Sequence, residues 1–127
     1  KSNDYMNCPS GVPSVQHTLL ILLELVREGI YSLNDLPYYL SHKVADRFKI
    51  VDRGYIREGY WADCVLVDLE QKYTVTKENT AYFCGWSPFE GDTFHSKVVS
   101  TFVNGRHAYN NGKILETNLG VQLKFDR

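Results

Sequence analysis

The densest run of hydrophobic positions lies near the start of the chain, between residues 19 and 26. Pro13 stands shortly before this run, where proline suits the first turn of a helix. Gly29 follows the run and is typical of a helix end. The spacing predicts a helix that begins at Pro13 or Ser14, since serine is a good cap, and ends at Gly29. Its apolar residues cover nearly every face, which exceeds the single stripe of a surface helix.

Two shorter helices are predicted next. The capping residues in the segment 32–35 favour a helix that begins at about Asp35, because Pro37 then falls in the first turn. A third helix is expected from Lys43 to Phe48.

From about residue 50 the pattern changes to short apolar runs separated by turns. Cys64-Val65-Leu66-Val67 is a four-residue apolar run and predicts a buried strand. A further strand is expected at 73–75. The segments 97–103 and 106–109 flank Asn104-Gly105, a strong signal for a β-hairpin. Another turn precedes residues 113–115, and the last dozen residues are interpreted as a tail that lies on a neighbour.

Composition narrows the class of protein. The chain has 127 residues, 43% hydrophobic and 23% charged, and a formal net charge of −1 with both signs scattered. The sequence has no basic stripe of the kind that binds nucleic acid, and no apolar run reaches the roughly 18 residues of a membrane span. The three cysteines form no CxxC pair, and their odd count argues against a disulfide framework and favours the cytoplasm.

The first residues have the pattern of an interior segment. A polar loop runs from Lys1 directly into the apolar helix, with no initiator Met and no signal-peptide pattern. A helix that is apolar all round also needs partners on several sides. We therefore expect a piece of a larger enzyme, which exposes Leu20, Leu23 or their neighbours and self-associates when isolated.

Three motifs resemble the C-terminal end of dihydroorotases, which belong to the cyclic-amide branch of the amidohydrolase superfamily. The first is C-P-S-G-V-P-S-V-Q over residues 8–16. The second is G-Y-I-R-E-G-Y-W-A-D-C-V-L-V-D over 54–68. The third is C-G-W-S-P-F-E-G over 84–91, followed by T-F-V-N-G over 101–105. The first and third favour dihydroorotase, whereas hydantoinases, dihydropyrimidinases and allantoinases share the second.

The resemblance implies an α+β fragment in which the last helices of a (β/α)₈ barrel precede the C-terminal share of a small β-sandwich. Residues 1–48 would carry the substrate loop and the barrel helices. Residues 49–127 would form the β portion and the tail. The missing remainder of the barrel would be the main partner, and the resemblance leaves a homo-oligomer open.

The activity implied is the reversible interconversion of N-carbamoyl-L-aspartate and (S)-dihydroorotate in pyrimidine synthesis. Such enzymes hold two zinc ions, and the resemblance places all their metal ligands before Lys1. We therefore expect no catalytic zinc and no activity from this piece alone. By the family pattern, Ser10 and Gly11 would meet the substrate ring through backbone groups, with Pro9 shaping the turn.

Other candidate residues favour structural roles. None of the four histidines lies at a ligand spacing from another histidine or a cysteine. Asp63 lies in a turn, where an aspartate commonly bonds to backbone, and Cys84 is interpreted as a packing residue. Residues 86–89 form an aromatic segment that is expected to pack on the missing barrel or on a partner subunit. They also support an alternative in which the chain is a non-catalytic β-rich assembly module.

Overall fold

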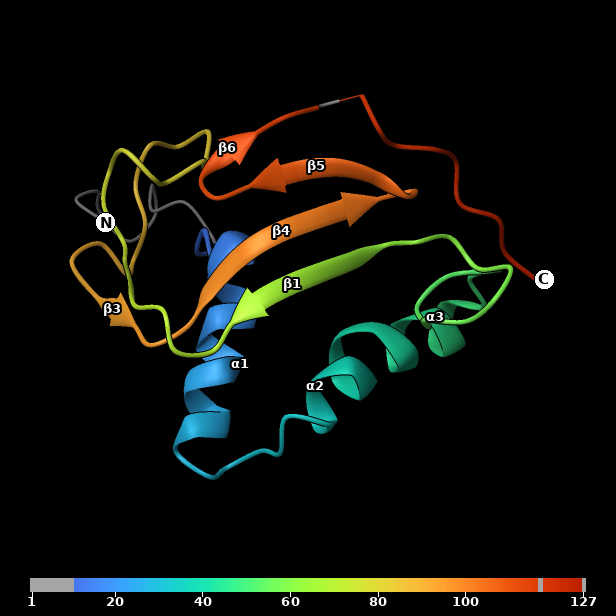
Figure 1. The fold of residues 1–127 in the computed structure, drawn as a ribbon, viewed down its shortest axis with the longest axis horizontal. Coiled ribbons are helices and arrows are strands. Elements are labelled where there is room, and N and C mark those ends of the chain that lie inside the picture. Colours follow the sequence, from blue (N-terminus) through green and yellow to red (C-terminus); the bar gives the residue numbers. More distant parts are fainter. Residues whose placement is uncertain (1–10, 117, 127) are drawn as a thin grey trace, which may run out of the picture.

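The computed structural model describes residues 11–116 and 118–126, and its N-terminal part is helical (Figure 1). A 3₁₀ turn, η2 (Val15–His17), leads into the helix α1 (Thr18–Arg27). The end of α1 at Arg27 lies close to Gly29, as the sequence predicts. Gly29 has a φ of 77°, in the region that favours glycine and that a helix cannot continue through.

Three short helical elements follow as one continuous arm. They are α2 (Asp35–Pro37), the π-helical turn η3 (Tyr38–His42) and α3 (Lys43–Phe48). The predicted start at Asp35 and the predicted bounds of α3 are confirmed. The arm ends where Lys49 turns left-handed, with a φ of 53°.

The second half of the chain forms two antiparallel sheets. The larger sheet has the strand order β1-β4-β5-β6, and the smaller one pairs β2 with β3. Their bounds are β1 (Cys64–Asp68), β2 (Tyr73–Thr74), β3 (Thr93–Phe94), β4 (Lys97–Val103), β5 (Arg106–Asn110) and β6 (Lys113–Ile114). The predicted hairpin is confirmed, because Asn104 and Gly105 connect β4 to β5 with positive φ values of 53° and 78°.

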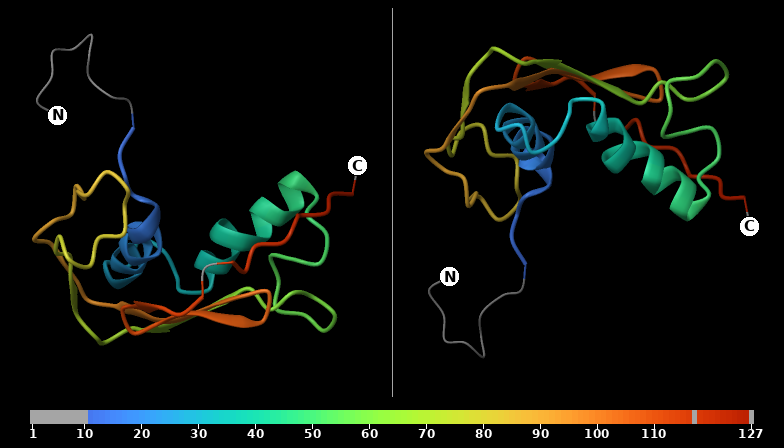
Figure 2. Two further views of the ribbon diagram at one scale, coloured as in Figure 1. Left: turned by 90° about the horizontal axis from the view of Figure 1, so that it is seen from above. Right: turned by 90° about the horizontal axis from the view of Figure 1, so that it is seen from below.

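The helices all lie on one side of the larger sheet. Both views in Figure 2 place α1 and the helical arm on this side, and no other described element covers the opposite face. The fold class is therefore α+β, with a four-stranded sheet and helices on one face. Among the described helices, none has the length and apolar character needed to cross a membrane.

One hydrophobic core joins the helices to the strands. It is formed by Leu20, Leu23, Leu36, Val75 and Phe94. The prediction that Leu20 or Leu23 is exposed is therefore wrong, since only 4% and 6% of their surfaces are accessible. The segment that contains Val75 and Phe94 covers this face of α1 from a distance in sequence that local patterns do not reveal.

The strand β1 is more exposed than the sequence predicted, whereas α1 is more buried. Val65 and Leu66 are 41% and 56% exposed, although the apolar run predicted a buried strand. The reason is the position of β1 at the edge of the sheet, where only β4 pairs with it. Val65 and Leu66 thus lack cover from the described residues of this chain, whereas Val67 packs against the core.

The C-terminal tail packs on its own chain. Ile50 forms a β-bridge with Phe125, and the N–H of Val51 donates to the carbonyl of Lys124 at 2.9 Å. The end of the tail is thereby fixed beside α3, as Figure 1 also shows.

Candidate functional site

The predicted substrate loop is described only at its last residue. Pro9 and Ser10 lie outside the described residues. Gly11 is exposed and has a φ of 81°, and a Cβ added there would meet nothing within 4 Å. The conformation alone therefore explains a glycine at this position, and the open space leaves its backbone groups accessible.

Directly after this loop, Gln16 binds a segment that lies more than 60 residues away in the sequence. Its side-chain Nε2 donates to the carbonyl of Asn79 at 2.7 Å. Its Oε1 accepts the N–H of Ala81 at 2.8 Å. Its backbone N–H donates to the hydroxyl oxygen of Tyr82 at 2.9 Å. We call these three hydrogen bonds the Gln16 clamp. No local sequence signal indicated it.

His17 is buried among aromatic rings, with none of its surface accessible. The ring of Phe94 stacks on it at 6.0 Å, and three further rings meet it at 5.6–6.4 Å, those of Tyr73, Tyr82 and Phe89. His17 is therefore a buried, structural residue, which confirms the prediction that this histidine is structural or on the surface.

The polar contacts and the burial of His17 favour the neutral form of its imidazole. Nδ1 lies 3.2 Å from the Tyr82 hydroxyl and 3.5 Å from Ser87 Oγ, whereas the buried Nε2 has no hydrogen-bond partner among the described residues. Each hydroxyl already accepts a backbone N–H, from Gln16 and Phe89 respectively, so each can donate to Nδ1. Burial lowers the pKa of His17, and we therefore assign a neutral imidazole with its proton on Nε2.

The other three histidines lie apart from His17. His42 stacks on Tyr55 with a centroid distance of 4.2 Å, and His107 stacks on Phe102 at 4.6 Å. His95 bonds to Glu24. Across residues 11–116 and 118–126, no group of three or more His, Cys, Asp or Glu could hold a metal ion. The described residues therefore do not fit a zinc centre, and no catalytic step through zinc is assigned to them.

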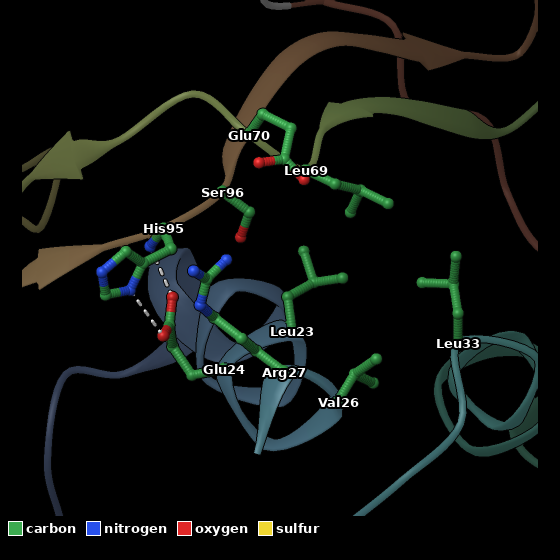
Figure 3. A pocket seen from close by; sticks show the side chains of 9 residues that line it. All are labelled: Leu23, Glu24, Val26, Arg27, Leu33, Leu69, Glu70, His95 and Ser96. Carbon is green, nitrogen blue, oxygen red and sulfur yellow. Dashed lines mark hydrogen bonds and ion pairs between the residues drawn. The ribbon is translucent and has the colours of Figure 1, made fainter. Parts of the chain in front are cut away.

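Glu24 and His95 border a pocket of about 210 Å³ between α1 and the ends of the strands (Figure 3). The carboxylate of Glu24 accepts the backbone N–H of His95 and lies 3.0 Å from its Nδ1. Burial raises the pKa of Glu24. The hydrogen bonds from His95 lower it by a larger amount, so the net shift of the pKa is downward. Arg27 and the buried Ser96 also line the pocket, and Leu23 contributes to its apolar wall.

Three remaining candidates have mixed outcomes. Asp63 accepts the backbone N–H of Asn104 at 2.7 Å and pairs with Arg53, which confirms its structural interpretation. Cys84 is exposed rather than packed, so the interpretation of a packing cysteine is wrong. The aromatic segment is divided, because Trp86 is 41% exposed whereas Phe89 packs against the core.

Comparison with known proteins supports one family. A dihydroorotase from Clostridium acetobutylicum is 36% identical over 110 residues, which is 86% of this chain and 26% of that enzyme. An allantoinase from Desulfitobacterium hafniense is 32% identical over 125 residues, which is 98% of this chain and 28% of that enzyme. No protein-family model matches the chain.

Solved structures give the same result for the fold. The L-hydantoinase (dihydropyrimidinase) from Arthrobacter aurescens matches with a TM-score of 0.81 and 25% identity, over 89% of this chain and 26% of that enzyme. A dihydropyrimidinase from Brevibacillus agri NCHU1002 matches with a TM-score of 0.79 and 32% identity, over 88% of this chain and 25% of that enzyme.

These similarities define the class of protein. The chain is related to cyclic amidohydrolases, and it corresponds to the C-terminal part of an amidohydrolase-family enzyme. It spans only about a quarter of the length of these relatives, 26% and 28% of the two enzymes compared by sequence.

Proposed function

We propose that this chain is the C-terminal section of a dihydroorotase, a hydrolase that interconverts N-carbamoyl-L-aspartate and (S)-dihydroorotate. The observation that carries the proposal is the 36% identity to a dihydroorotase over 86% of the chain. The loop motif over residues 8–16 and the segment 84–91 support it, because both resemble dihydroorotases more than their relatives.

The proposed architecture assigns residues 1–48 to the substrate loop and the last helices of a (β/α)₈ barrel. Residues 49–127 form the C-terminal share of a small β-sandwich. The uncovered edge of β1, with Leu66 56% exposed, supports this assignment because an apolar edge strand needs a covering partner. The remainder of the enzyme is the partner that would cover it.

The chemistry is proposed to come from the remainder of the enzyme. Two zinc ions would be held there and would supply an activated hydroxide for attack on the ring amide. The role of this section is substrate contact through the backbone groups of Ser10 and Gly11, with Pro9 shaping the turn. The section alone would have no hydrolytic activity.

A second candidate function is hydrolysis of another cyclic amide by the same fold. The allantoinase match covers 98% of the chain, and the structural matches are named as hydantoinases and dihydropyrimidinases. Allantoin, hydantoins and dihydropyrimidines are therefore the competing substrate classes.

The experiment that separates these candidates is a substrate panel on the full-length enzyme that contains this chain. The value of kcat/KM would be measured for dihydroorotate, allantoin, hydantoin and dihydrouracil under the same conditions. The proposal predicts that dihydroorotate gives the highest value by at least about tenfold, the factor that corresponds to 1.4 kcal/mol in transition-state binding. A higher value for another substrate in the panel would contradict it.

A further inference from the structure

The first helical turn after Gly11 lacks an ordinary cap. Ser14 stands at the N-cap position of η2 but makes no side-chain capping hydrogen bond. The first N–H groups of a helix have no partner within the helix and need an acceptor from elsewhere. Tyr82 provides one, because its hydroxyl oxygen accepts the N–H of Gln16 at 2.9 Å. A distant side chain thus performs the task of a local cap.

The side-chain amide of Gln16 strengthens the same connection. It donates to the carbonyl of Asn79 and accepts from the N–H of Ala81, at 2.7 and 2.8 Å. The amide therefore satisfies both a backbone acceptor and a backbone donor of one short segment. All four polar groups involved gain a partner, which makes this contact specific in direction and register.

The clamp fixes the chain up to the edge of the loop. The carbonyl of Ser14 accepts the N–H of His17 at 2.9 Å and the hydroxyl of Thr18 at 3.1 Å. Gly11 stands three residues before Ser14, and its φ of 81° lies where glycine moves with little steric restriction. Ser14 is thus a fixed point close to a residue that is intrinsically flexible.

We infer that Gln16 and Tyr82 are positioning residues for the substrate loop. They fix the chain at residues 14–16, directly after Gly11 to Pro13, and so reduce the entropy that is lost when the backbone of Gly11 binds a cyclic-amide ring. The inference rests on the proposed function, which assigns the loop to substrate. It also gives the segment 79–82 a role in substrate affinity without any contact with substrate.

The test uses the full-length enzyme with two substitutions. Tyr82→Phe keeps the ring but removes the hydroxyl, and Gln16→Met keeps the side-chain length but removes both polar groups. Each is expected to raise KM for the cyclic amide about five- to tenfold, the factor for one or two lost hydrogen bonds. The value of kcat should stay within about twofold, because the loop contacts are made equally in the ground state and the transition state.

The matched control is Tyr55→Phe. Its hydroxyl also bonds at 2.8–2.9 Å, to the carboxylate of Asp46, but it lies outside the clamp. The control should leave KM unchanged. A purely structural role for the clamp predicts the same kinetics for Tyr82→Phe as for this control.

Hydrogen exchange on the 127-residue chain supplies a readout that does not depend on substrate. The backbone amides of Ala81 and of residues 11, 12 and 14–18 should exchange faster in both clamp variants and at the wild-type rate in the control. Unchanged exchange, or faster exchange with KM unchanged, would overturn the inference. So would a fall in kcat with KM unchanged.

Failure of the proposed function is distinguishable from failure of the inference. If the wild-type enzyme hydrolyses a different cyclic amide and not dihydroorotate, only the proposed substrate is wrong, and the KM series is measured with that amide. If it hydrolyses no cyclic amide, both are overturned.

Discussion

Gly54 packs directly against the side chain of Ala45. A Cβ added to Gly54 would lie 2.4 Å from the Cβ of Ala45 and 3.1 Å from the carbonyl oxygen of Ser41. The φ of Gly54 is also 82°, in the region that favours glycine. This close approach joins the helical arm to the turn that begins the β half of the chain.

Substituting Gly54→Ala should therefore destabilise the fold by about 2–5 kcal/mol. Overpacking against Ala45 contributes about 1–3 kcal/mol, and the left-handed backbone adds about 1–2 kcal/mol. Urea denaturation followed by circular dichroism would measure the loss in the free energy of unfolding.

Gly59→Ala is the matched control. Gly59 has the same φ of 82°, but an added Cβ would meet nothing within 4 Å. It should lose only the backbone contribution of about 1–2 kcal/mol. Equal losses for the two variants would show that the contact between Gly54 and Ala45 is not the cause.

Burial of His17 predicts a specific dependence of stability on pH. Because burial lowers its pKa, the folded state takes up a proton less readily than the unfolded state, whose histidine pKa is about 6.5. The unfolded state then binds more protons below about pH 6.5, so its share grows as the pH falls. The stability contribution is complete above that pH and decreases below it, towards the lowered pKa of the folded state.

The measurement is the free energy of unfolding between pH 7.5 and 5 for the wild type and for His17→Gln. The variant should show a smaller decrease over this interval, because the other three histidines are common to both proteins. Identical pH dependence in the two proteins would contradict a neutral, buried His17.

The contact between Glu24 and His95 predicts a second effect on stability. Glu24→Gln removes the charge that strengthens two hydrogen bonds from His95 but keeps one acceptor oxygen. A loss of about 1 kcal/mol is expected at pH 7. The difference should shrink as the pH falls below 4.5 through the lowered pKa of the wild-type carboxyl, since protonation removes the same charge. A loss that does not shrink over this range would assign it to packing instead.

Local patterns were sufficient for several elements of this fold. The Asn104-Gly105 turn and the helix α3 were predicted from residues adjacent in sequence, because turn and helix preferences act over a few residues. Gly29 likewise identified the end of α1. Such features depend little on what the rest of the chain does.

Features that depend on distant contacts were not predictable. Leu20 and Leu23 are covered by residues that include Phe94, and Gln16 binds residues more than 60 positions away. An apolar run such as 64–67 also does not reveal whether its strand lies at the centre or the edge of a sheet. Of these two elements, β1 and not α1 therefore carries exposed apolar side chains.

The edge strand β1, and not α1, is therefore the surface expected to cause self-association. Leu66 lies on an edge strand and is 56% exposed, so the 127-residue chain should associate through β1. Leu66→Lys should weaken association at least about fivefold in sedimentation equilibrium, because a charge on an edge strand opposes pairing. Ile56→Lys is the control, since Ile56 is 94% exposed but lies outside every strand. Equal effects of the two substitutions would exclude β1 as the contact surface.

The most direct test of the account compares the full-length enzyme with the 127-residue chain, each with added zinc and dihydroorotate. We predict measurable formation of N-carbamoyl-aspartate by the full-length enzyme and none above background by the chain alone. Hydrolysis by the isolated chain would contradict the assignment of the chemistry to the remainder of the enzyme. An inactive but folded full-length enzyme would contradict the assignment to dihydroorotase.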